Sequence, residues 1–312
     1  MRPSSNTRAH PHLLALLASL SVIAQLLCPT PGCAAGALAV APATARFTVT
    51  VRGTGPDVIL IPGLASSAHV WDAEATRLEA HYRLHLVQVS GFAGTPAGPN
   101  ASGPVLQPLV DAIAAYIESR RLTRPAVIGH SIGGLMGLLL AVQHPDRVGR
   151  LMIVDSLPWY GAAVAGPTAT PATLQPQAAA LRDLVVGESE EAYAASEPMA
   201  MARLVKSVGP EARAALAAAL TSDHRVVGQA TYDDLMTDLR TRLSEVRAPV
   251  MVLYPWDAAM GAPQNAVDAF YTGAFAGVAG AKVHRVDGAF HFLMIDQPDA
   301  FAHEVDVFLA GR

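Results

Sequence analysis

The segment PAVIGHSIGGLMGLLLAV, residues 125–142, is the most informative part of this chain. Residues 125–128 form a short apolar run, which is typical of a buried strand, and residues 134–142 are typical of a helix packed on a sheet. Between them lies a Gly-x-Ser-x-Gly pentapeptide, residues 129–133. A serine on such a tight strand-to-helix turn adopts a strained backbone and projects its hydroxyl from the sheet. The pattern therefore predicts that Ser131 is a nucleophile; an ordinary Gly-rich turn is the competing interpretation.

The composition favours one large globular domain with room for an inserted subdomain. The chain has 312 residues, of which 51% are hydrophobic and 15% are charged, and its formal net charge is -4. Because Lys and Arg form no cluster, we expect no nucleic-acid partner. The sequence has no His-Glu-x-x-His motif, no cysteine cluster and no Gly-x-x-x-x-Gly-Lys-Ser/Thr loop, so we predict no metal site and no cofactor.

The amino-terminal 37 residues have the pattern of a signal peptide. Arg2 and Arg8 precede an apolar run, residues 13–27, and Ala35-Gly36-Ala37 fits a cleavage site. A spanning helix needs roughly 20 apolar residues, so this run is short for a membrane anchor. We therefore predict an exported protein, periplasmic or secreted, with no stable membrane insertion after cleavage. The alternative is a retained leader, which would fit a membrane-tethered structural protein.

Both cysteines of the chain, Cys28 and Cys33, lie inside this leader. If cleavage falls near Ala37, the mature chain has no cysteine. It then has neither a disulfide nor a thiol nucleophile, even in an oxidising compartment.

After the leader, short apolar runs alternate with helical patterns, which predicts an α/β protein with a mostly parallel sheet and helices on both faces. Strict alternation over residues 46–52 indicates an edge strand. The other expected strands are residues 58–61, 84–89, 126–128, 151–154, 250–254 and 282–286, and the expected helices include 71–81, 106–120 and 134–143. Residues 161–245 break the alternation with a Pro/Thr-rich entry and Ala/Leu-rich helical stretches. We interpret them as a helical lid or cap inserted into a core formed by residues 46–160 and 246–312; helices that merely pack beside the sheet are the alternative.

The motifs together resemble the α/β-hydrolase fold family, over roughly residues 46–309. Ile61-Pro62-Gly63-Leu64 looks like the family's oxyanion loop, although Pro62 stands where the family often has His. The loop at residues 90–94 is similar too, but it lacks the family's common preceding Asp. The elbow at residues 129–133 and the chain order Ser, acid, His complete the resemblance.

The resemblance implies a triad of Ser131, Asp257 and His291. A serine hydroxyl needs a base, and His291 follows the last expected strand, where a loop can present it. Asp257 follows the strand at residues 250–254 and would hold the imidazole in one tautomer. The main rival is Asp155, at the end of the strand at residues 151–154, which we interpret as a turn or helix-capping carboxylate.

The resemblance also implies an oxyanion hole formed by the backbone N–H groups of Leu64 and Ile132. Candidate substrate-binding residues are Leu64, Phe92, Trp159 and Tyr160, for which core packing is an equally good interpretation.

The leading hypothesis is an exported serine hydrolase that cleaves carboxylic esters or lactones of small molecules through an acyl-enzyme on Ser131. The alternatives are an amidase or acyl-homoserine-lactone-degrading hydrolase of the same fold, and a non-catalytic ligand-binding protein on a hydrolase scaffold. Fold alone does not set the substrate, and the sequence leaves the oligomeric state open.

Overall fold

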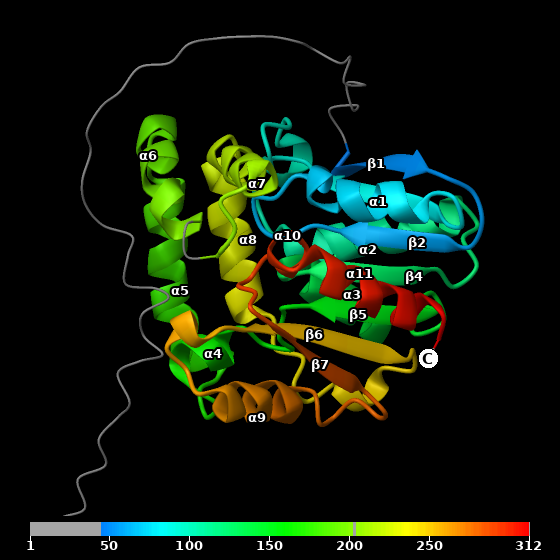
Figure 1. Cartoon of the computed structure of the whole chain (residues 1–312). Coiled ribbons are helices and arrows are strands. Elements are labelled where there is room, and N and C mark those ends of the chain that lie inside the picture. Colours follow the sequence, from blue (N-terminus) through cyan, green and yellow to red (C-terminus); the bar gives the residue numbers. More distant parts are fainter. Residues whose placement is uncertain (1–44, 202–203, 312) are drawn as a thin grey trace, which may run out of the picture.

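The computed structural model describes residues 45–201 and 204–311, so the predicted signal peptide lies outside the described residues. Strands and helices alternate along most of the chain (Figure 1). The strands are β1 (Phe47–Arg52), β2 (Asp57–Ile61), β3 (Arg83–Val89), β4 (Ala126–His130), β5 (Arg150–Val154), β6 (Val250–Trp256) and β7 (Lys282–Asp287). The helices are α1 (Asp72–Leu78), α2 (Leu106–Ser119), α3 (Ile132–Gln143), α4 (Gly161–Ala165), α5 (Pro171–Val186), α6 (Glu190–Met201), α7 (Pro210–Leu220), α8 (His224–Met236), α9 (Gln264–Ala274), α10 (Leu293–Asp296) and α11 (Pro298–Leu309). Short 3-10 turns are η2 (Ala68–Trp71), η3 (Gly98–Ala101), η4 (Leu243–Glu245) and η5 (Ala258–Met260).

The strands form one sheet in the order β1-β3-β2-β4-β5-β6-β7. Only the edge strand β1 runs antiparallel to its neighbour; the other pairs within the described residues are parallel. The predicted fold class and edge strand are therefore confirmed. The central strands β2, β4 and β5 are apolar and buried, as a sheet covered by helices on both faces requires.

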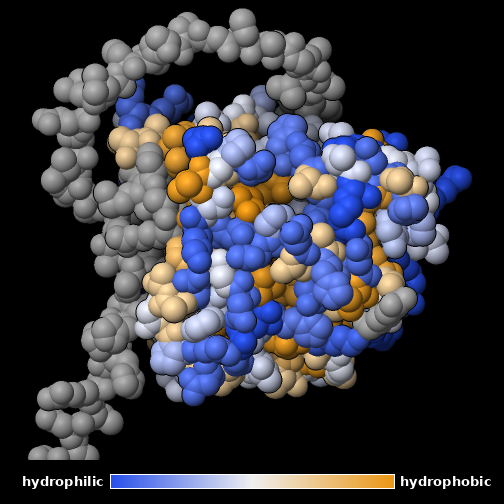
Figure 2. Space-filling model, viewed as in Figure 1, coloured by the Kyte–Doolittle hydropathy of each residue, from blue (hydrophilic) through white to orange (hydrophobic). Residues whose placement is uncertain are grey.

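The carboxyl ends of β4, β5, β6 and β7 lie at one edge of the sheet, because these strands are parallel neighbours. Side chains that follow these strands therefore come close together, which is where open α/β sheets place their ligand sites. The surface in Figure 2 intermingles hydrophilic residues with smaller hydrophobic areas, as expected once most apolar side chains enter the core.

The chain between β5 and β6 contributes helices α4–α8 and no strand within its described residues. Figure 1 shows α5–α8 grouped at one end of the sheet. Backbone hydrogen bonds join this segment to loops of the core: the Asp223 N–H donates to the Gly91 carbonyl oxygen (2.7 Å), the Gly94 N–H to that of Thr221 (3.0 Å), and the Phe292 N–H to that of Leu204 (3.2 Å). Helices α4–α8 agree with the helical character predicted for residues 161–245. The division into a core and a separate cap stays a prediction.

The turn between β4 and α3 depends on two glycines. A Cβ on Gly129 would lie 2.2 Å from the Gly133 carbonyl oxygen. A Cβ on Gly133 would lie 2.5 Å from the Ile61 carbonyl oxygen. Both obstacles are backbone atoms, which cannot rotate away, so the sequence spacing of the pentapeptide reflects a steric requirement.

We expect Gly133→Ala to destabilise the protein by about 3 kcal/mol, because overpacking against backbone costs roughly 1–3 kcal/mol or more. The measurement is the free energy of unfolding from urea titration. Gly273→Ala is the matched control, because Gly273 lies in α9 and a Cβ added there would meet no atom within 4 Å. That helix substitution should gain up to about 1 kcal/mol, and equal stability of both variants would contradict the steric explanation.

Candidate active site

Ser131 occupies the turn between β4 and α3 with φ +54° and ψ −127°. Its N–H donates to the Val154 carbonyl oxygen at 2.9 Å, and its own carbonyl oxygen accepts from the Gly134 N–H at 2.8 Å. The backbone is thus fixed on both sides in a conformation that side chains rarely adopt, and the residue keeps partial solvent exposure. This is the geometry expected of an exposed nucleophile on an elbow.

His291 lies on the loop after β7 and pairs with a carboxylate that follows β5. Its Nδ1 lies 2.6 Å from Asp155 Oδ2, and the two side chains are 22% and 11% exposed. Asp155 has φ +43°, a left-handed backbone that ends β5 abruptly. With Nδ1–H donating to Asp155, the other ring nitrogen, Nε2, is left as the basic one.

The expectation that Asp257 orients His291 is wrong in this structure. Asp257 Oδ2 accepts from Lys206 Nζ at 2.6 Å, and its other oxygen accepts from the Ala259 N–H at 2.8 Å, which caps η5. These hydrogen bonds hold the pKa of the Asp257 carboxyl below its usual range. The physical reason lies in the sheet order: β5 adjoins the strand that carries Ser131, whereas β6 lies one strand further away. Asp155, interpreted from the sequence as a capping carboxylate, is instead the partner of His291.

Tyr271, on α9, is a member of the site that the sequence did not indicate. Its hydroxyl donates to Asp155 Oδ1, so the two oxygens of that carboxylate are held by different partners. Its ring stacks on Tyr254, with centroids 4.4 Å apart. Burial raises the pKa of Tyr271 well above 10, and the negative charge of Asp155 acts in the same direction. The hydroxyl therefore stays protonated and can donate throughout the neutral range. No motif surrounds Tyr271, and it lies 116 residues from Asp155.

We expect Tyr271→Phe to lower kcat about tenfold and to leave KM nearly unchanged. A hydrogen bond to a charged group contributes roughly 1.5–3 kcal/mol, and part of this loss would appear as a less well oriented imidazole. Steady-state kinetics on an ester substrate measure the effect. A tenfold rise of KM at constant kcat would instead indicate that Tyr271 contacts substrate.

Two further groups hold the loop that carries His291. The buried ring of His130 donates from Nε2–H to the His291 carbonyl oxygen at 2.9 Å. Burial and the neighbouring His291 lower the pKa of His130 well below 6.5, so it acts as a neutral donor. Asp296 accepts from the N–H groups of Phe290 (2.9 Å) and Ser207 (2.7 Å). It thereby joins the loop to the chain that leads from α6 to α7.

The predicted oxyanion loop lies against the elbow. A Cβ on Gly63 would be 3.1 Å from Ser131 Cβ and 2.9 Å from His130 Nδ1, so the loop approaches the serine as closely as glycine allows. Neither the Leu64 N–H nor the Ile132 N–H has a backbone acceptor among the residues that the structure describes. Both donors are free for a ligand, and their role as an oxyanion hole stays a prediction.

Two of the four predicted substrate contacts are wrong in this structure. Phe92 is 0% exposed and Trp159 is 1% exposed, so both belong to the core. Trp159 is fixed there by its Nε1–H, which donates to the Leu235 carbonyl oxygen at 2.7 Å. Leu64 and Tyr160 keep partial exposure and remain candidate contacts.

No group of three or more His, Cys, Asp or Glu side chains with the arrangement of a metal site occurs in the part of the chain that the structure describes. Within residues 45–201 and 204–311, no helix has the length and apolar character needed to cross a bilayer.

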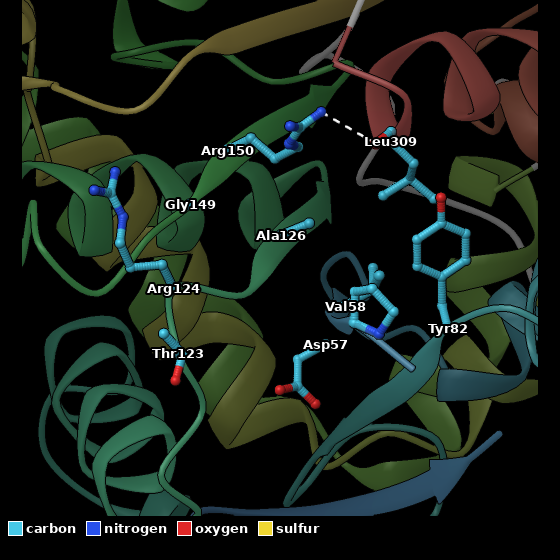
Figure 3. A pocket seen from close by; sticks show the side chains of 10 residues that line it. Asp57, Val58, Tyr82, Thr123, Arg124, Ala126, Gly149, Arg150 and Leu309 are labelled. Atoms are coloured by element: carbon cyan, nitrogen blue, oxygen red, sulfur yellow. Dashed lines mark hydrogen bonds between the residues drawn. The ribbon is translucent and has the colours of Figure 1, made fainter. Parts of the chain in front are cut away.

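A cavity of about 560 Å³ lies at the opposite end of the sheet, at the start of β2, β4 and β5 (Figure 3). Its charged groups already have partners. Arg150 donates to the Leu309 carbonyl oxygen, as the dashed line in Figure 3 shows, and Asp57 pairs with Arg83 and His85. These contacts tie the carboxyl-terminal helix and two strands together, so the lining is structural.

The strained serine, the histidine–carboxylate pair and the mostly parallel sheet define a class of protein, the α/β hydrolases. The family model for the Alpha/beta hydrolase family matches residues 58–304, and the chain belongs to this family.

Among known proteins, the chain is 35% identical over 122 residues to a pimeloyl-[acyl-carrier protein] methyl ester esterase of Aeromonas salmonicida (strain A449), which covers 39% of this chain and 46% of that protein. A protein of the same name from Pectobacterium carotovorum subsp. carotovorum (strain PC1) is 27% identical over 81% of this chain and 93% of its own length. The chain thus matches less than half of the Aeromonas salmonicida protein, and the longer match is the one of lower identity. An esterase from Exiguobacterium antarcticum has a similar structure, with a TM-score of 0.70 at 16% identity, over 85% of this chain and 95% of the other; at this identity the similarity shows the fold alone.

Proposed function

We propose that this protein hydrolyses carboxylic esters, lactones included, through an acyl-enzyme formed on Ser131. The observation that carries the proposal is the contact of His291 with Asp155. The loop that carries His291 also contacts His130, the residue before Ser131, and Ser131 is held at φ +54°. The esterase names of the relatives support the same reaction class.

In the proposed reaction, Ser131 Oγ attacks the ester carbonyl carbon while His291 Nε2 accepts the hydroxyl proton. Asp155 keeps the proton on Nδ1 and stabilises the imidazolium that forms. The N–H groups of Leu64 and Ile132 would stabilise the developing oxyanion; such donors typically contribute about 10²–10³ each in rate. Collapse of the tetrahedral intermediate breaks the bond to the alcohol, which leaves with the proton from His291. Water, deprotonated by His291, then releases the acid and restores the serine.

The test is release of p-nitrophenol from acetate, butyrate and octanoate esters, with a γ-lactone, an acyl-homoserine lactone and a p-nitroanilide in parallel. We expect ester turnover and labelling of Ser131 by a fluorophosphonate, located by peptide mass spectrometry. A preference for the anilide or the homoserine lactone would move the chain to those alternatives. Absence of both turnover and labelling would refute the proposal in favour of a ligand-binding protein.

We further propose that helices α4–α8 act as a lid and that the mature protein is exported. Two backbone hydrogen bonds with core loops, one accepted by Leu204 and one donated by Asp223, support the first part. The charge and hydropathy pattern of residues 1–37 supports the second. The intact mass of the protein expressed in a bacterium and recovered from the periplasm tests export. A mass that includes residues 1–37, in the membrane fraction, would refute cleavage.

A further inference from the structure

The chain that leads from α6 to α7 lies against the loop that carries His291. We call its residues 204–207 the strap; they form neither helix nor strand. The Leu204 carbonyl oxygen accepts from the N–H of Phe292, the residue after His291, at 3.2 Å. Leu204 and Val205 also pack, partly buried, against the hydrophobic core. The strap is thus a direct neighbour of the main chain at the proposed base.

Asp296, the last residue of α10, joins the strap to the other side of His291. Its Oδ2 accepts from the N–H of Phe290, the residue before His291, at 2.9 Å. The Ser207 N–H of the strap donates to Oδ1 at 2.7 Å, and the Lys206 N–H is shared between the two oxygens, at 3.0 and 3.1 Å. In Figure 1, α10 lies close to α7, to which the strap leads. One carboxylate therefore binds three main-chain N–H groups, two from the strap and one from the loop of His291.

Other contacts hold the same loop to the core without the strap. The His130 ring donates to the His291 carbonyl oxygen at 2.9 Å, and the side chains of Phe292 and Leu293 are 2% and 0% exposed. The loop should therefore stay folded when the strap is released. The strap adds restraint on the two N–H groups that flank His291, and so on the position of the imidazole relative to Ser131.

We propose, on the basis of the proposed esterase function, that Asp296 is a positioning residue through which the strap holds His291 in place to act on Ser131. Hydrogen bonds from main-chain N–H groups to a carboxylate are charge-assisted and short, so they restrain the loop firmly. A displacement of a reacting group by about 1 Å can cost roughly 10² in rate. The base is correctly placed only while the strap is bound, so the chain between α6 and α7 controls the chemical step.

The first variant is Asp296→Asn. An asparagine side chain has one acceptor oxygen, so it cannot bind the strap and the Phe290 N–H at once. We expect kcat for p-nitrophenyl butyrate to fall roughly 10- to 100-fold. The KM should stay within about threefold, because substrate binding does not require an oriented base. Asp299→Asn is the matched control, since Asp299 is an exposed acid nearby on α11, and it should leave kcat unchanged.

The strap itself is tested by Ser207→Pro, which removes the N–H that donates to Asp296 and interrupts no helix. Ser207→Ala is the matched control, because it keeps this N–H and removes only the hydroxyl. Ser207→Pro should lower kcat at nearly constant KM, and Ser207→Ala should not. In the Asp296→Asn background, Ser207→Pro should cause little further loss, because the link is already broken. Losses that multiply in full, or an unchanged kcat in both single variants, would overturn the proposal.

A role of Asp296 in stability alone is separated from positioning by proton NMR of the folded variants. The Nδ1–H that His291 donates to Asp155 should give a low-field resonance, assigned by its loss in Asp155→Asn. We expect this resonance to shift or broaden in Asp296→Asn and Ser207→Pro, and to stay in place in Asp299→Asn and Ser207→Ala. A lower kcat with an unchanged resonance would overturn the positioning role.

Failure of this role and failure of the esterase proposal are distinguishable. Ester turnover by wild type with the same kcat in Asp296→Asn overturns the positioning role alone. If wild type turns over no ester, the resonance decides, because it requires no substrate. A change in Asp296→Asn and Ser207→Pro then supports the link between the strap and His291, and an unchanged resonance overturns it.

Discussion

Ser131→Ala should reduce kcat for p-nitrophenyl butyrate about 10⁶-fold, since removal of the nucleophile in a serine triad has roughly that effect. The remaining histidine and oxyanion donors can then act only on direct attack by water. Because alanine at φ +54° carries the same backbone strain as serine, and Ser131 makes its structural hydrogen bonds through the main chain, the fold should be retained. We expect the free energy of unfolding to change by less than about 0.5 kcal/mol.

Ser102→Ala is a suitable control, because Ser102 is an exposed residue at the end of η3. It should leave both kcat and stability unchanged. Turnover by Ser131→Ala at more than a hundredth of the wild-type rate, in a sample free of contaminating esterase, would rule out an acyl-enzyme on this residue.

The parts of the fold that could be predicted from sequence are those determined by local pattern. Continuous apolar runs identified the buried strands, because a strand covered on both faces needs apolar residues at every position. The glycines at positions 129 and 133 identified the elbow, because the backbone of Ile61 and the chain itself leave no space for a side chain there. Chain order then led to His291, the histidine on the loop after the last strand.

The acid could not be predicted in the same way. Asp155 and Asp257 both follow apolar strands that end at the same edge of the sheet, so periodicity and burial treat them alike. The choice depends on contacts made across the chain: Tyr271 and His291 with Asp155, and Lys206 with Asp257. Lys206 and Tyr271 lie in segments without a motif.

Asp155→Asn should lower kcat about 10⁴-fold, whereas Asp257→Asn should stay within about threefold of wild type. An asparagine can present its amide N–H to His291 Nδ1, which favours the imidazole tautomer with the proton on Nε2 and so removes the base; the equivalent change in a serine protease costs about 10⁴. Asp257 loses only a contact with Lys206, which is 49% exposed, and exposed ion pairs contribute less than about 1 kcal/mol. The two variants are isosteric, so kcat measured on the same ester compares the acids directly.

The ranking of these two variants also tests the geometry itself. If Asp257→Asn were the inactive variant, the working enzyme would use the acid expected from the sequence, and His291 would have to leave Asp155 during turnover. The double variant separates these cases. When only Asp155 acts on His291, adding Asp257→Asn to Asp155→Asn should change kcat by no more than it does in wild type, because residues that share no partner have additive effects. A much larger loss of kcat in the double variant would mean that Asp257 can take over from Asp155 as the partner of His291 when Asp155 is replaced.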